Sequence, residues 1–201
     1  AKAIGNTYNL LESRGFDNAM KGVHSILLGH NRYATQGRVS VRNAHPFEFP
    51  NVVGAHNGTV QMSSLSKFHG YVDYDVDSKI IYSHLSHLGA GGIDAVWEAA
   101  DGALALTWWD KQDKTLKMIR NKERPLHVAY SQDDTQIFWA SEAWMFWVAA
   151  NRHGIKLKDY IELVPNRLYT FTFTAEGKVQ HIERDLPPFV AKPIFVGQNN
   201  W

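Results

Sequence analysis

The 201-residue chain contains no cysteine. This absence excludes disulfide bonds, thiolate metal ligands and a cysteine nucleophile within the sequence. The chain also lacks a long apolar run, because every such run is well short of the ~20 residues that a membrane-spanning helix needs. The first residues, AKAIGNTYNL, carry one lysine and no extended apolar stretch, so they do not resemble a signal peptide.

Charge of one sign is not in excess either. The 21 basic and 20 acidic residues give a formal net charge of +1 and form no basic stripe, so nucleic acid is not an expected partner. There is no glycine-rich phosphate loop, and His84 and His87 lack the further ligands of a metal site. We therefore expect no metal and no cofactor, and a cytoplasmic protein without a membrane segment.

The apolar pattern predicts a mixture of helices and short strands. We expect one domain over residues 1–201, with an extended, proline-marked tail at 185–201. The predicted helices lie at 7–21 (interrupted at Arg14-Gly15), near 63–68, from 77 to 88, at 93–100 and at 141–154. The predicted strands lie at 23–31, 52–56 and within 103–140, followed by a hairpin around Glu176-Gly177. Strands alternating with helices favour stacked layers of helix and sheet.

The segment GHNRYATQG at 29–37 gathers polar side chains where a predicted buried strand ends. Such groups are costly unless they are hydrogen-bonded to one another or to a ligand. The Arg32 guanidinium is suited to grip a carboxylate through two parallel hydrogen bonds. The alternative is an ordinary structural ion pair with an acidic residue.

Two further segments allow more than one interpretation. Asn57-Gly58-Thr59 is a hairpin turn on local evidence, a glycosylation acceptor, or an oxyanion hole made by an amide side chain and a glycine N–H. Asp77 stands where a helix begins, so it is either an N-cap or a ligand for an ammonium group.

Four segments in order carry a family resemblance: GHNRYATQG, NAHPF, GAHNGTV and DVDSKIIYSHL. They resemble the glutaminase domain of class II glutamine amidotransferases, which are N-terminal-nucleophile hydrolases with the patterns G-H-T-R-[W/Y]-A-T-x-G, N-A-H-P, H-N-G and an aspartate opening a helix. Weaker similarity continues to about residue 150. The resemblance implies an α+β fold, a four-layer αββα sandwich of two antiparallel sheets.

The resemblance also implies roles for individual residues around a free glutamine. Arg32 would hold the α-carboxylate with help from the backbone at Tyr33 and from Thr35. Asp77, with the Gly58 backbone, would hold the α-ammonium group.

At the reacting amide, Asn57 and Gly58 would form the oxyanion hole, and His45 and Pro46 would shape the loop beneath the site. The chain departs from the pattern at Tyr33 and Gln36. It departs again at Val76 and Lys79, where the family usually shows T/S-D-x-E around the helix start.

The largest departure concerns the nucleophile, which in this family is a cysteine at the first position of the mature chain. Here residue 1 is alanine. Either Ala1 replaces the nucleophile, or the chain lacks an N-terminal segment that includes the catalytic strand. The few elements before Gly29 favour the second interpretation. In both cases the polypeptide as written should not hydrolyse glutamine by the family mechanism.

Three functions follow as hypotheses. The first is a glutaminase that releases ammonia from glutamine for an acceptor synthetase domain or subunit. The second is a non-catalytic protein that binds glutamine or another amino acid in the same pocket. The third is an interaction module whose contact surface uses the seven tryptophans.

Overall fold

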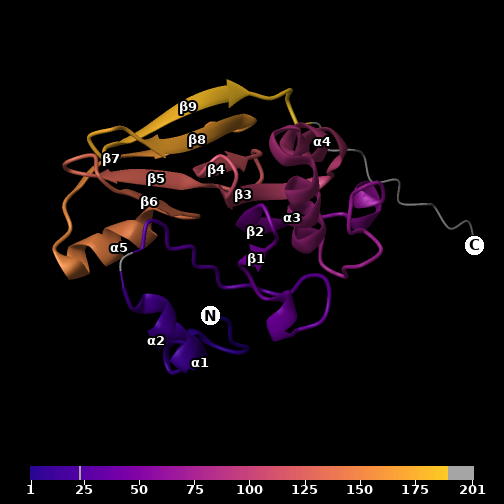
Figure 1. Cartoon of the computed structure of the whole chain (residues 1–201), viewed down its shortest axis with the longest axis horizontal. Helices are drawn as coiled ribbons and strands as arrows, with labels where there is room; N and C mark the ends of the chain where they lie inside the picture. Colours follow the sequence, from indigo (N-terminus) through magenta and orange to yellow (C-terminus); the bar gives the residue numbers. More distant parts are fainter. Residues whose placement is uncertain (23, 190–201) are drawn as a thin grey trace, which may run out of the picture.

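The computed structural model describes residues 1–22 and 24–189 and contains two antiparallel sheets (Figure 1). The larger sheet has the strand order β1-β2-β3-β4-β8-β9, and the smaller has the order β6-β5-β7. The strands are β1 (Phe47–Glu48), β2 (Val52–Val60), β3 (Gly102–Asp110), β4 (Thr115–Arg120), β5 (His127–Ser131), β6 (Ile137–Ala140), β7 (Leu157–Glu162), β8 (Arg167–Phe173) and β9 (Val179–Asp185).

Helices lie outside both sheets. They are α1 (Thr7–Leu11), α2 (Arg14–Met20), α3 (Asp77–Leu88), α4 (Gly92–Ala99) and α5 (Ala143–His153), with short 3₁₀ turns at Val41–Asn43, Met62–Leu65 and Gly89–Gly91. In Figure 1, α3 and α4 lie at the β2–β3 end of the larger sheet, and α5 lies against the smaller sheet. The predicted αββα sandwich of two antiparallel sheets is confirmed.

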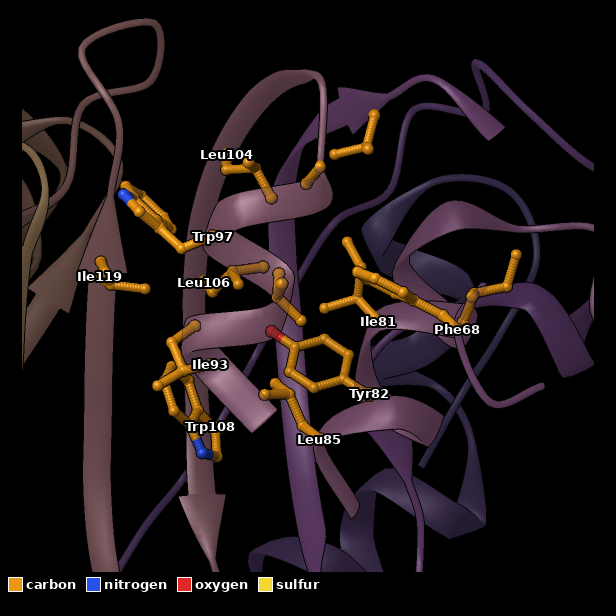
Figure 2. Close-up of a cluster of buried hydrophobic side chains, with 14 of the residues drawn as sticks. Phe68, Ile81, Tyr82, Leu85, Ile93, Trp97, Leu104, Leu106, Trp108 and Ile119 are labelled. Atoms are coloured by element: carbon orange, nitrogen blue, oxygen red, sulfur yellow. The ribbon is translucent and has the colours of Figure 1, made fainter. Parts of the chain in front are cut away.

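One core lies between the larger sheet and the helices α3 and α4 (Figure 2). The buried Tyr82 hydroxyl donates to the Ala55 carbonyl oxygen at 2.5 Å and lies 3.2 Å from that of Thr107. A side chain at Gly54 would overlap the Tyr82 ring, so this glycine permits the close approach of α3. These contacts fix the start of α3 relative to β2, and both elements carry predicted site residues.

A second core lies between the two sheets. Met118 of β4, Val128 of β5 and Leu163 are fully buried there, and Tyr169 and Phe171 of β8 complete the layer. Fully burying an aliphatic side chain of this kind is worth about 1.5–3 kcal/mol. This apolar layer holds the two sheets face to face.

The predicted strand at 23–31 is wrong for the described residues. Residues 24–31 belong to no strand, and none of their described backbone groups hydrogen-bonds to another backbone group. The apolar run correctly indicated contact with the interior, because Ile26 packs against the core between the sheets. Burial alone does not make a strand, which also needs a neighbouring strand to pair with.

The helix predicted at 141–154 exists as α5, and only one of its faces is covered, although a sequence that is apolar nearly all round is typical of a helix covered on both faces. Only Phe146 and Ala150 are buried, whereas 61% of Trp144 is exposed. The smaller sheet covers one face of the helix, and no described element packs on the other. Glu142 is the residue before the first turn, and Gly154 ends the helix in the left-handed conformation at φ +65°.

Other observed helix and strand boundaries also differ from the predicted ones. The 7–21 helix breaks two residues earlier than predicted, because the Ser13 hydroxyl accepts a hydrogen bond from the Phe16 N–H at 3.1 Å and starts a new helix. The hairpin around Glu176-Gly177 is confirmed, and β7 was not predicted. Residues 186–189 of the predicted tail have no regular structure, and 190–201 lie outside the described residues. Within the described part, no helix is long and apolar enough to cross a membrane.

Candidate functional site

Asn57 and Gly58 lie inside β2, which continues to Val60 beside β3, so the hairpin interpretation of Asn57-Gly58 is wrong. Gly58 has φ +146°, a conformation that favours glycine. A Cβ at this position would overlap the carbonyl oxygen of Ala103 on β3. The strand therefore passes very close to its neighbour at the residue that the resemblance places in the oxyanion hole.

The loop that carries Arg32 is docked at the end of β2. The Thr35 and Thr59 hydroxyls lie 3.0 Å apart, and the Gln36 side-chain amide donates to the Val60 carbonyl at 2.8 Å. Arg32 itself donates to the backbone oxygen of Gln36. The polar cluster at 29–37 is thus partly satisfied by its own members and by β2.

The charge of Arg32 has no acidic partner among the residues that the structure describes. The structural ion-pair alternative for this residue is therefore wrong for the described part of the chain. Tyr33, the next residue, is 90% exposed, so its side chain contributes no packing here. A half-buried guanidinium without a carboxylate can accept an anionic ligand.

Asp77 joins the end of β2 to the start of α3. One carboxylate oxygen accepts from the Val60 N–H at 2.7 Å, and the other accepts from the Ser78 N–H at 2.8 Å. Val76, not Asp77, is the N-cap, and Asp77 is the first residue of the helix. The Ser78 hydroxyl also lies 3.3 Å from the second of these oxygens, and only 4% of Asp77 is exposed. An ammonium group would therefore have to reach a nearly covered carboxylate.

The Asp77 carboxylate belongs to a buried group with His56 and Ser78. His56 Nδ1 lies 2.9 Å from the Ser78 hydroxyl and 4.0 Å from the Asp77 carboxylate, and His56 Nε2 lies 3.1 Å from the Ala103 carbonyl oxygen. Because a carbonyl only accepts, we assign the ring proton to Nε2 and let Ser78 donate to Nδ1. Burial lowers the pKa of His56 against the opposing effect of the Asp77 charge.

This group is a buried network, in which 3% of Ser78 and 2% of His56 are exposed. It holds Asp77 between β2 and α3. No sequence motif predicts this grouping. The available signal was that His56 lies in a predicted strand, one residue before Asn57, and alternation in a strand points the two side chains to opposite faces.

A pair of histidines joins the segment 24–31 to the loop before β1. The His45 ring is buried between His30, whose centroid is 4.1 Å away, and Phe47 at 4.5 Å. Neither ring nitrogen of His45 has a hydrogen-bond partner in the described structure. Burial, together with the neighbouring His30, lowers the pKa of His45 to about 2, and burial with the nearby His56 lowers that of His30 to about 4. Both rings are therefore neutral at pH 7.

We expect the free energy of unfolding to fall as the pH drops below about 6.5. The unfolded chain gains a proton at His45 in that range, while the folded chain does not until pH about 2. Each such group contributes a slope of about 1.4 kcal/mol per pH unit. Urea unfolding at several pH values between about 4.5 and 6 measures this slope. His45→Leu should reduce it by the contribution of one proton. An unchanged slope in His45→Leu would contradict the assignment.

A cavity of about 960 Å³ lies between the two sheets. Asn57 of β2 and residues 24–31 line it, together with strands of both sheets and Phe146 of α5. Arg32 and Asp77 are not in its lining. The structure therefore brings Arg32, Thr35 and Asp77 to the end of β2, and it places Asn57 at the cavity.

Ala1 lies elsewhere. It lines a separate cavity beside β1 and lies against Gly15 of α2, and it does not contact the cavity that Asn57 lines. The residue that aligns with the family's nucleophile under the first interpretation is therefore not next to the predicted oxyanion hole.

Four features together define the class of protein to which this domain belongs. They are two facing antiparallel sheets between helices, His-Asn-Gly on β2, the Arg32 loop docked at the end of β2, and an aspartate that opens α3. The chain is a glutaminase-type domain of the class II glutamine amidotransferases, with the N-terminal-nucleophile fold.

The relatives are glutamine–fructose-6-phosphate aminotransferases (isomerizing). That of Xylella fastidiosa is 41% identical over 147 residues, which is 67% of this chain and 24% of the relative. That of Buchnera aphidicola is 30% identical over 135 residues, 65% of this chain and 19% of the relative. The chain spans between a fifth and a third of the length of the curated relatives it matches. No family model matches the chain.

Two solved structures share the fold. One is the glutamine phosphoribosylpyrophosphate amidotransferase from B. subtilis complexed with ADP and GMP, with a TM-score of 0.50, 17% identity, and coverage of 76% of this chain and 33% of that one. The other is described as the allosteric regulatory enzyme of purine biosynthesis, with a TM-score of 0.53, 16% identity, and coverage of 74% and 33%.

Proposed function

We propose that this domain binds free glutamine at the end of β2. Arg32 holds the α-carboxylate with Thr35 beside it, Asp77 faces the α-ammonium group, and Asn57 with Gly58 receives the amide oxygen. The observation that carries this proposal is that the Arg32 guanidinium is held by a loop docked on β2 and has no acidic partner in the described structure. A zwitterionic ligand supplies the missing anion and needs the nearby carboxylate.

Hydrolysis of glutamine to glutamate and ammonia through a covalent acyl intermediate needs a nucleophile that these 201 residues do not contain. Our proposal is that a cysteine on a segment outside this sequence supplies it. The cavity of about 960 Å³ and the unpaired backbone of residues 24–31 support this, because they offer room and hydrogen-bonding groups for one more strand. The domain alone would then bind glutamine without cleaving it.

A partner that accepts the ammonia is the second part of the proposal. The relatives extend well beyond the part that this chain matches. The outer face of α5 and the adjoining β7 expose apolar side chains, namely Trp144, Trp147, Val148, Tyr160 and Ile161. Exposed apolar side chains gathered in this way are typical of a surface that another domain covers. A cytoplasmic location belongs to the same proposal, and cell fractionation would test it.

Calorimetry with glutamine, glutamate and asparagine, combined with an ammonia assay, tests the proposal. We expect the 201-residue chain to bind glutamine in preference to asparagine and to release no ammonia. N-terminal sequencing and intact mass of the natural gene product then decide between the two functions. A leading cysteine and ammonia release would establish a glutaminase, whereas glutamine binding without turnover in the natural product would establish a non-catalytic binder. Absence of glutamine binding in both proteins would reject the proposal.

A further inference from the structure

A second cavity, of about 490 Å³, lies beside β1. It shares no lining residue with the cavity between the sheets. Its walls come from the amino-terminal segment, the 3₁₀ turn at Val41–Asn43, β1 and α3. The lining includes the side chains of Lys2, Arg42, Phe47, Tyr74 and Lys79.

Three cationic side chains line this cavity, and none of them has an ion-pair partner among the side chains that the structure describes. Glu48 also lines the cavity, and the charges of Glu48 and Asp75 act on Lys2 and Lys79, but both acids have other partners. Glu48 pairs with Lys111 at 2.9 Å, and Asp75 accepts from the Arg38 N–H at 3.3 Å and from Asn43. Lys2, Arg42 and Lys79 therefore leave the cavity with an excess of positive charge.

The positions of the two lysines are fixed by aromatic rings. The Lys79 ammonium lies 4.9 Å from the centre of the Tyr74 ring, and the Lys2 ammonium lies 5.3 Å from that of Phe47. Burial lowers the pKa of both lysines, and the charges of Arg42 and Lys2 lower the pKa of Lys79 further. Cation–π contacts offset part of the free-energy cost of keeping these lysines charged. An anion between the cations would offset more of it.

Lys79 is also a departure from the family pattern. In the resemblance, an aspartate at the helix start is followed two positions later by a glutamate, and that second position is Lys79 here. The exchange of an acid for a base converts one wall of the cavity from negative to positive. The positive character is therefore a property of this chain's own sequence.

We propose that this cavity binds a small phosphate monoester, with the phosphate between Lys2, Arg42 and Lys79. A phosphate dianion matches a cluster of three cations better than a monocarboxylate does, and the arginine fork suits phosphate oxygens. Phe47, Phe49 and Pro50 supply apolar walls for the group that carries the phosphate. The volume leaves room for such a group beside the phosphate.

Calorimetric titration of the intact chain with phenyl phosphate, inorganic phosphate and benzoate tests this site. We expect phenyl phosphate to bind most tightly and benzoate least. Lys79→Gln and Arg42→Gln should each weaken phenyl phosphate binding by about tenfold or more, while Lys79→Arg retains it. The matched control is Lys178→Gln in the turn between β8 and β9, which removes one exposed charge at the opposite edge of the larger sheet.

The proposal is overturned if phenyl phosphate does not bind, if benzoate binds as well, or if Lys178→Gln weakens binding as much as the cavity variants do. Thermal unfolding of each variant confirms that it is folded. Arg42 is exposed, so Arg42→Gln remains a test if Lys79→Gln unfolds. Arg32→Ala should leave phenyl phosphate binding unchanged, which separates this site from the glutamine site.

Discussion

Replacing Arg32 with alanine is expected to weaken glutamine binding by about 100-fold or more, beyond the range of calorimetry. The variant removes the only cation proposed for the α-carboxylate, and a two-pronged, charge-assisted contact cannot be replaced by water at the same strength. Arg32→Lys keeps the charge but loses the planar fork, so an intermediate affinity is expected. Titration calorimetry of all three proteins measures the effect.

The matched control for this experiment is Arg38→Ala in the same loop. Arg38 is exposed, and its backbone N–H, not its side chain, bonds to Asp75. This control should bind glutamine as the original chain does. Unchanged affinity in Arg32→Ala would show that the proposed site is wrong, because no other residue in the proposal supplies a positive charge for the carboxylate.

Replacing Gly58 with alanine is expected to lower the free energy of unfolding by about 3 kcal/mol or more. The new methyl group would overlap the Ala103 carbonyl oxygen, and the backbone at φ +146° is strained for any residue with a side chain. Relief requires β2 and β3 to separate in the middle of the larger sheet. Urea unfolding followed by tryptophan fluorescence measures the loss.

The control for this prediction is Gly91→Ala in the 3₁₀ turn before α4. A methyl group there meets no atom within 4 Å, so the expected change is within about 0.5 kcal/mol. A Gly58→Ala protein as stable as this control would mean that β2 and β3 separate at little cost. The geometry described for Gly58, a proposed oxyanion-hole residue, would then be wrong.

The layered fold followed from sequence because its patterns are local. The helix from Asp77 repeats apolar residues at 3.6-residue spacing, and the hairpin at Glu176-Gly177 alternates along both strands. These patterns depend on residues close in the chain. The four motifs then supplied the arrangement of two sheets, which periodicity alone left open.

The errors have a common cause, which is that strands and exposed faces depend on distant neighbours. The 24–31 segment has the apolar run of a strand but no partner, and α5 has the composition of a buried helix but only one sheet to cover it. Asn57-Gly58 has the local signature of a turn, yet pairing with β3 keeps it extended. In each case a long-range contact, or its absence among the described residues, outweighed the local preference.

The candidate site was only partly predictable. The docking of the Arg32 loop on β2 agrees with the order of the motifs, but the His56–Ser78 network around Asp77 joins residues from separate elements and has no sequence motif. The Arg32→Ala titration tests whether the predicted binding residues hold glutamine.

The unpaired segment at 24–31 has a consequence for affinity. Amides of β2 lie within a continuous ladder and open only when the sheet does, whereas those of 24–31 have no backbone acceptor in the described structure. Arg32 directly follows this segment, so a ligand that grips its guanidinium also has to restrict the chain that leads to it. Part of the binding free energy is then consumed as conformational entropy, at about 1–2 kcal/mol for each backbone residue newly fixed. A strand laid beside 24–31 would remove that cost in advance, and it would tighten glutamine binding without contacting glutamine.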